Sequence, residues 1–137
     1  MENLTDPIAA DELLYRRVPV SMNWYDPDSG VLEPQAFDPH RKNDVTGISV
    51  FRKKHKSLIE AARGQPGKSY YVAVLCARDL QANRIRVVPR PRLNDPGHAE
   101  LPDLNTENRK SDEALELQRV LVELSRRVEG PFASAVP

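Results

Sequence analysis

Residues 70–76, which read Tyr-Tyr-Val-Ala-Val-Leu-Cys, decide the fold because they form the longest uncharged apolar run in the chain. The run is rich in aromatic and β-branched residues and is too short for a typical globular helix. A strand with one face in water alternates apolar and polar residues, and this run does not. We therefore expect residues 70–76 to form a strand that is buried on both faces and carries the rest of the fold.

The composition is that of one domain with a modest core. The chain has 137 residues, which is enough to bury a single core, but only 39% of them are hydrophobic. Its 12 prolines predict much irregular chain. We expect a single domain over residues 1–137, with a flexible lead-in at 1–11 and a flexible tail at 129–137.

Segments on both sides of the central run complete an α+β pattern. Residues 12–18, 46–51 and 84–88 predict further strands, which gives a small sheet of about four strands. Residues 57–63 predict a short helix that packs on this sheet. Residues 111–128 predict a long C-terminal amphipathic helix, because apolar residues recur there at helical spacing: Leu117, Val120, Leu121, Leu124 and Val128.

The cysteine content and the lengths of the apolar runs bound the environment. Cys76 is the only cysteine, so the sequence holds no disulfide framework and no Cys/His spacing for a metal site. A lone cysteine in an apolar strand is typical of a small core residue and of a reducing compartment. No run approaches the ~18–20 apolar residues of a membrane span, and the N-terminus lacks a signal-peptide pattern. We expect a soluble, cytoplasmic protein that binds no membrane.

The 20 basic and 20 acidic side chains cancel in number but occupy different parts of the sequence. Residues 1–38 and 93–137 are acidic overall, whereas residues 41–68 and 78–92 are basic. Such blocks can compensate one another within the fold or can face an outside partner. The candidate binding residues are therefore basic ones, namely Arg52, Lys53, Lys54, Lys56, Arg84 and Arg86.

The cluster at residues 52–56 and the arginines of residues 84–92 could follow a phosphate backbone. Dedicated nucleic-acid domains, however, are usually basic overall and offer several stacking aromatics. This chain is neutral, and the cluster has only Phe51 beside it. Nucleic-acid association is therefore the third of the functions we consider.

The sequence contains no phosphate-binding loop, dinucleotide fingerprint, nucleophile elbow or zinc-protease motif. The closest approach to an acid/base pair is His98 with Glu100. In an extended chain both side chains would point to the same face, where they could transfer protons together. The alternative is a loop histidine that hydrogen-bonds the backbone.

Three short signatures occur in the first three quarters of the chain: Leu14-Tyr15-Arg16, the stretch from Asp44 to Val50, and Gly97-His98-Ala99. Together they resemble the signatures of a family of small bacterial proteins that has no assigned function. The resemblance covers residues 13–101 and implies no particular chemistry.

A weaker similarity is to ADP-ribosyltransferase-type domains, which place an arginine or histidine on a first strand, a serine or tyrosine on a second, and a glutamate late in the fold. The resemblance implies NAD as cofactor, with Arg16 on its phosphate or ribose and Ser49 orienting the nicotinamide ribose. Glu100 would stabilise the positive charge that develops as nicotinamide leaves. The chain departs from that pattern in lacking Ser-Thr-Ser on the second strand and a paired Glu/Gln-x-Glu at the third position.

Two main classes of function follow. The first is a non-catalytic binding or regulatory module of a multi-component bacterial system, of the toxin–antitoxin or defence kind, with another protein as partner and no cofactor. Its support is the absence of catalytic motifs, the segregated charge and the long proline-punctuated loop at residues 19–43. The second is an NAD-consuming transferase with a catalytic group of Arg16, Ser49, His98 and Glu100 around one cleft.

Overall fold

The structure is a computed structural model that describes residues 5–39 and 44–134. It has an α+β fold, in which one antiparallel sheet has the strand order β6-β7-β4-β1-β5-β8. In that order the strands are Val88–Pro89, His98–Leu101, Ile48–Arg52, Leu13–Pro19, Ser69–Cys76 and Arg127–Ala133. A second, two-stranded sheet joins β2 (Tyr25–Asp26) to β3 (Val31–Leu32).

The run that decides the fold is confirmed as a strand buried on both faces. Residues 70–76 of β5 pair with β1 on one edge of the strand, and β5 pairs with β8 on its other edge. Every residue from Tyr70 to Cys76 is buried. Apolar side chains point to both faces of β5 because both faces are covered by other elements.

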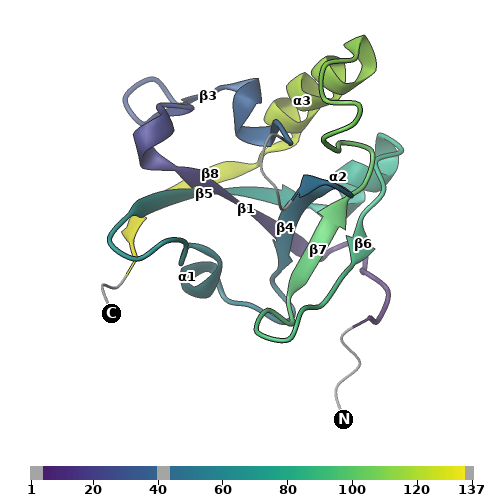
Figure 1. Cartoon of the computed structure of the whole chain (residues 1–137), viewed down its shortest axis with the longest axis horizontal. Coiled ribbons are helices and arrows are strands. Elements are labelled where there is room, and N and C mark those ends of the chain that lie inside the picture. The colour runs from purple at the N-terminus through teal and green to yellow at the C-terminus, as the bar shows by residue number, and fades with distance from the viewer. Residues whose placement is uncertain (1–4, 40–43, 135–137) are drawn as a thin grey trace.

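Helices cover the two faces unequally. Figure 1 shows α3 (Asp112–Leu124) and the β2–β3 hairpin on one side of the sheet and α1 (Leu58–Ala61) on the other. The first side holds the larger core, to which α2 (Ala77–Ala82) and the 3-10 helix η2 (Pro34–Phe37) also contribute. A second 3-10 helix, η1 (Val20–Met22), follows β1 directly. The second side holds a smaller core of Tyr15, Phe51, Ala61, Ala62, Val72 and Val74.

The sheet therefore has six strands rather than the four predicted, and the predicted strand at 84–88 is wrong over most of its length. Only Val88–Pro89 pairs, as β6. Arg84 has a left-handed backbone with φ of 58°, which ends the extended path before it starts. The backbone N–H of Arg86 donates to the Asp103 carboxylate at 3.0 Å, so a side chain takes the place of a neighbouring strand.

The C-terminal helix is 13 residues long, so the prediction of a long helix over 111–128 is also wrong. The helix ends at Leu124 with Ser125 as its C-cap, and the next backbone N–H, that of Arg126, donates to the carbonyl of Val74 at 2.8 Å. This bond brings the chain back to β5, and Arg127–Ala133 then forms the edge strand β8. The predicted tail at 129–137 thus contributes residues 129–133 to the sheet, while 135–137 lie outside the described residues.

The predicted lead-in also contacts the body of the fold. Ile8 packs against the larger core, and the carbonyls of Ala10 and Glu12 accept hydrogen bonds from the first turn of α2. Residues 1–4 of that segment lie outside the described part. In the described part of the chain, no helix combines the length and the apolar character needed to cross a membrane.

Candidate functional site

The candidate site lies where β1 and β4 separate. The two strands pair at only two positions, Leu14↔Arg52 and Tyr15↔Phe51, and Figure 1 shows them diverging beyond that point. The carbonyl of Ser49 has therefore lost its partner in the β1 ladder. Instead it accepts a hydrogen bond from Nη1 of Arg16 at 2.9 Å. A buried carbonyl needs a donor, and the arginine supplies one where the strand does not.

Arg16 is held as a buried guanidinium. Its side chain is 6% exposed, and its Nε donates to the carbonyl of Ala36 at 3.0 Å. Ala36 belongs to η2, so the loop between β3 and β4 fixes the direction of the arginine from outside the sheet. Carbonyl oxygens orient a guanidinium but carry no negative charge of their own.

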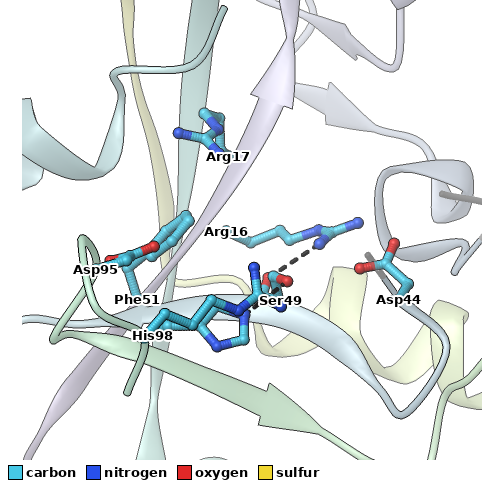
Figure 2. A pocket seen from close by; sticks show the side chains of 8 residues that line it. Arg16, Arg17, Asp44, Ser49, Phe51, Asp95 and His98 are labelled. Carbon is cyan, nitrogen blue, oxygen red and sulfur yellow. Dashed lines mark hydrogen bonds between the residues drawn. The ribbon is translucent and has the colours of Figure 1, made fainter. Parts of the chain in front are cut away.

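The gap between the two strands is a cavity of about 70 Å³. It is lined by Arg16, Arg17, Asp44, Ser49, Phe51, Arg92, Asp95 and His98. Figure 2 shows Arg16 and Asp44 reaching toward one another on one side, with Ser49 and His98 side by side below them. This volume is far below the about 300–1,000 Å³ of pockets that enclose a drug-sized ligand. It suits a single small polar group.

Ser49 and His98 form a hydrogen-bonded pair from neighbouring strands. Oγ of Ser49 lies 2.9 Å from Nε2 of His98, whose Nδ1 lies 2.8 Å from the carbonyl oxygen of Arg90. Because a carbonyl only accepts, Nδ1 carries the proton, and Nε2 of the neutral ring accepts from the serine hydroxyl. Burial lowers the pKa of His98, with a smaller contribution in the same direction from the charge of Arg92.

Asp44 supplies an acceptor oxygen that no described residue uses. The residue is 1% exposed, and among the described residues no group donates a hydrogen bond to its Oδ2. A buried acceptor without a donor costs about 1–3 kcal/mol. Since Asp44 lines the cavity, an N–H or O–H group placed there would satisfy it.

Contacts between cations and aromatic rings hold Arg17 and Phe51, which also line the cavity. The Arg17 guanidinium lies 5.0 Å from the ring centre of Phe51 and 5.5 Å from that of Tyr70, and it donates to the carbonyls of Ala61 and Arg63. The Lys56 ammonium lies 4.3 Å from the Phe51 ring centre and 2.9 Å from Asp95. Contacts of this kind hold the side chains in place.

Three of the four residues predicted as catalytic come together here, and the fourth does not. Arg16, Ser49 and His98 line the cavity, whereas Glu100 does not. The Glu100 side chain is 3% exposed and accepts a bond from the Thr46 hydroxyl at 2.8 Å and an ion pair from Arg90 at 2.8 Å. His98 and Glu100 do occupy alternate positions of one strand, β7, as the extended-chain interpretation expects.

The basic residues predicted to bind a partner largely have carboxylate partners within the chain. Arg52 is fully buried and contacts Glu12 at 2.7 and 2.8 Å and Asp6 at 3.2 Å. The other ion pairs of this set are Lys54 with Asp6, Lys56 with Asp95, and Arg86 with Asp103. Lys53 and Arg84 are exposed, with no ion pair to any described carboxylate.

Sequence reasoning did not assign a role to three of the residues that line the cavity, namely Arg17, Asp44 and Asp95. It placed Arg92 only among the arginines of residues 84–92 that could follow a phosphate backbone. Asp44 opens the second of the three short signatures, and that was the one available sign of its position. Within residues 5–39 and 44–134, no three His, Cys, Asp or Glu side chains are grouped so as to hold a metal ion.

Comparison with known proteins adds no further assignment. No protein-family model, no curated protein and no solved structure matches this chain. The two resemblances given above therefore stay predictions.

Proposed function

We propose that this chain is a binding module whose cavity between β1 and β4 holds the C-terminal end group of a protein partner. The observation that carries the proposal is that one small cavity is lined both by arginine donors and by a buried acceptor to which no described residue donates. Arg16 and Arg92 supply guanidinium donors, and Asp44 supplies a buried oxygen that no described group serves.

The chemistry of the lining selects the ligand. Guanidinium groups bind carboxylates and phosphates through charge-assisted hydrogen bonds. Oδ2 of Asp44 would repel such a group unless the ligand also brings a donor close to its negative charge. The last residue of a polypeptide does so, because its carboxylate and its backbone N–H are attached to the same Cα. Capture of a terminal carboxylate is a known mode of peptide recognition.

Capture of a chain terminus is the contact by which a regulatory module of a multi-component bacterial system, of the toxin–antitoxin or defence kind, would bind its partner. Such systems work by contacts between proteins, and the terminal residue of a partner is an exposed group that another protein can bind. The free, buried Cys76 is compatible with the cytoplasm as the place of action.

An NAD-dependent ADP-ribosyltransferase is the second candidate, because Arg16, Ser49 and His98 share the cavity. The position of Glu100 gives it less support, since Thr46 and Arg90 already bind that carboxylate. Nicotinamide release from NAD by the purified protein, with Glu100→Gln as control, tests it. Turnover that is absent in the control supports the transferase, and its absence in both leaves the binding module.

Nucleic-acid association has the least support of the three functions. Arg52 is enclosed by the fold, and Lys54, Lys56 and Arg86 have carboxylate partners. The segregation of charge in the sequence is thus compensated within the molecule to a large extent. Only Lys53 and Arg84 of the predicted set remain as exposed cations without an ion pair to a described residue.

Small analogues of a chain terminus test the proposed function directly. In a ¹H–¹⁵N NMR titration, N-acetylglycine offers a carboxylate and an N–H, acetate offers the carboxylate alone, and N-acetylglycinamide offers no charge. We expect N-acetylglycine to shift the signals of Ser49 and His98, acetate to bind more weakly, and the amide not to bind. Arg92→Gln should weaken N-acetylglycine about tenfold, in line with the loss of one charge-assisted hydrogen bond.

Arg78→Gln is the matched control, because Arg78 is an exposed arginine on α2 and does not line the cavity. Its affinity for N-acetylglycine should equal that of the wild type. Equal binding of the acid and the amide would contradict the proposal. Binding of inorganic phosphate without binding of N-acetylglycine would also contradict it, and would indicate a phosphorylated ligand instead.

A further inference from the structure

The cavity also holds the parts of an activated nucleophile. We infer that Ser49 is a nucleophile activated by His98, and that the cavity can transfer small acyl groups from esters or thioesters to water. This inference goes beyond the proposed binding function and does not depend on it. It rests on the arrangement of three groups, the Ser49 hydroxyl, the His98 ring and the Arg90 carbonyl.

The direction of the two hydrogen bonds sets the roles of these groups. Nδ1 of His98 donates to the Arg90 carbonyl at 2.8 Å, so its Nε2 lone pair faces Oγ of Ser49 at 2.9 Å. An activated serine needs this chain, in which a base lies within hydrogen-bond reach of the nucleophile and a third group orients the base. Here a backbone carbonyl takes the orienting role that a carboxylate has in the familiar triads.

The base and the nucleophile differ in how far each is buried. The His98 side chain is 1% exposed, so its orientation is fixed and its ring is shielded from bulk water. Ser49 is only half-buried and opens onto the cavity. A reactant can therefore reach Oγ while the imidazole stays in place. Burial also lowers the pKa of His98, which keeps the ring neutral and able to accept a proton near neutral pH.

The reaction balances with water as the second reactant. Oγ of Ser49 bonds to the acyl carbon as its proton passes to Nε2 of His98, and the leaving alcohol or thiol departs with that proton. Water then attacks the acyl-serine, giving one proton to Nε2, which returns it to Oγ as the carboxylic acid is released. The arginines that line the cavity favour an acyl compound with an anionic end.

A neutral phosphorylating reagent, diisopropyl fluorophosphate, tests the nucleophile without using the anion site. We expect a single adduct, located on Ser49 by peptide mass spectrometry, in the native wild-type protein. Ser49→Ala should lose the adduct. Ser29→Ala should keep it, because Ser29 is an exposed serine whose Oγ donates to Asp26 at 2.9 Å but has no imidazole beside it.

His98→Gln tests the base, provided that circular dichroism shows the variant to be folded. We expect its labelling rate to fall about 100-fold or more, which is the size of a general-base contribution. Labelling of wild-type protein in denaturant gives the same information without a variant, because an unfolded chain loses the Ser49–His98 pair. Labelling there should disappear.

Three results would overturn the inference: no adduct on the native protein, an adduct on another serine, or labelling of Ser49 that persists in denaturant or in folded His98→Gln. The outcome is separable from that of the proposed function. Binding of N-acetylglycine without labelling supports the module alone, whereas labelling without binding supports the nucleophile alone.

Discussion

Two buried arginines on neighbouring strands, Arg52 of β4 and Arg16 of β1, are handled by the fold in opposite ways. Arg52 is fully buried and meets two carboxylates, those of Glu12 and Asp6. Arg16 is nearly as buried, and it donates hydrogen bonds to the backbone carbonyls of Ala36 and Ser49. The first guanidinium is paired with two carboxylates, whereas the second is oriented by two backbone carbonyls and lines a cavity.

The difference separates a structural cluster from a site. The guanidinium of Arg52 directs its N–H groups to Glu12 and Asp6, so it has no donor left for an outside ligand. Around the cavity, no described residue donates a hydrogen bond to the buried Oδ2 of Asp44. Unmet hydrogen-bonding capacity beside an accessible space is the physical mark of a binding site. Both clusters contain arginine, aspartate and histidine, so these residue types alone do not distinguish them.

The largest effect is expected from breaking the Arg52 cluster. Glu12→Gln keeps the size of the side chain but removes the charge that faces a fully buried guanidinium. Removing one partner of a buried ion pair costs about 3–5 kcal/mol, and the remaining Asp6 contact favours the lower end. We expect the free energy of unfolding to fall by about 3 kcal/mol in urea denaturation.

Glu33→Gln is the control for this change, since Glu33 is an exposed residue outside the ion pairs of the described chain. Its free energy of unfolding should stay within about 0.5 kcal/mol of wild type. A loss below about 1 kcal/mol in Glu12→Gln would show that the Arg52 cluster is not the structural element described above.

The same kind of change at the cavity should affect binding rather than stability. Asp44→Asn also exchanges a buried carboxylate for an amide, but Oδ2 of Asp44 has no donor among the described residues to lose. We expect the free energy of unfolding to change by less than about 1 kcal/mol. The affinity for N-acetylglycine should fall about tenfold, since a hydrogen bond to a charged group contributes about 1.5–3 kcal/mol. A large loss of stability without a loss of affinity would reverse the assignment.

Local patterns in the sequence predict the elements of this fold better than they predict its site. The apolar run of β5 has one physical interpretation, and alternation along β1 correctly separates Leu14 and Val18 from Tyr15. Alternation does not decide which arginine is buried, because Arg16 and Arg17 each follow an apolar neighbour on their own face. That choice depends on where the β1–β4 pairing ends, which is set by contacts between distant segments.

The charged partners show the same limit. Glu12 lies 40 residues from Arg52 in the sequence, and Asp6 lies 46 residues from it. No periodicity connects such positions, so a run of basic residues at 52–56 indicates an outward-facing surface although its first member is enclosed. Likewise, the segment that forms β8 has no apolar run of its own. It becomes a strand because it pairs with β5.

The smallest effects should appear in the acid range, where the two regions titrate over different pH windows. The pKa of His98 is lowered by burial, and Ser49, Arg92, Asp95 and Glu100 face or surround the ring. The unfolded chain then binds a proton at His98 more readily than the folded chain does. The contribution of His98 to the free energy of unfolding is therefore complete above about pH 6.5 and is lost as the pH falls below that value.

The pKa of Asp6 is also lowered, chiefly by its hydrogen bond to Lys54 and then by that to His55.

For Asp6 the same sign applies at lower pH. Its contribution is complete above the ordinary aspartate pKa of about 4 and is lost as the pH falls toward the depressed value in the folded state. Asp6→Asn should therefore flatten the stability profile below about pH 4 and leave the step near pH 6.5 unchanged, as measured by urea denaturation at a series of pH values. His98→Gln should do the reverse. If Asp6→Asn instead removed the step near pH 6.5, the two clusters would be coupled, and the separation between a completed ion pair and an open site would fail.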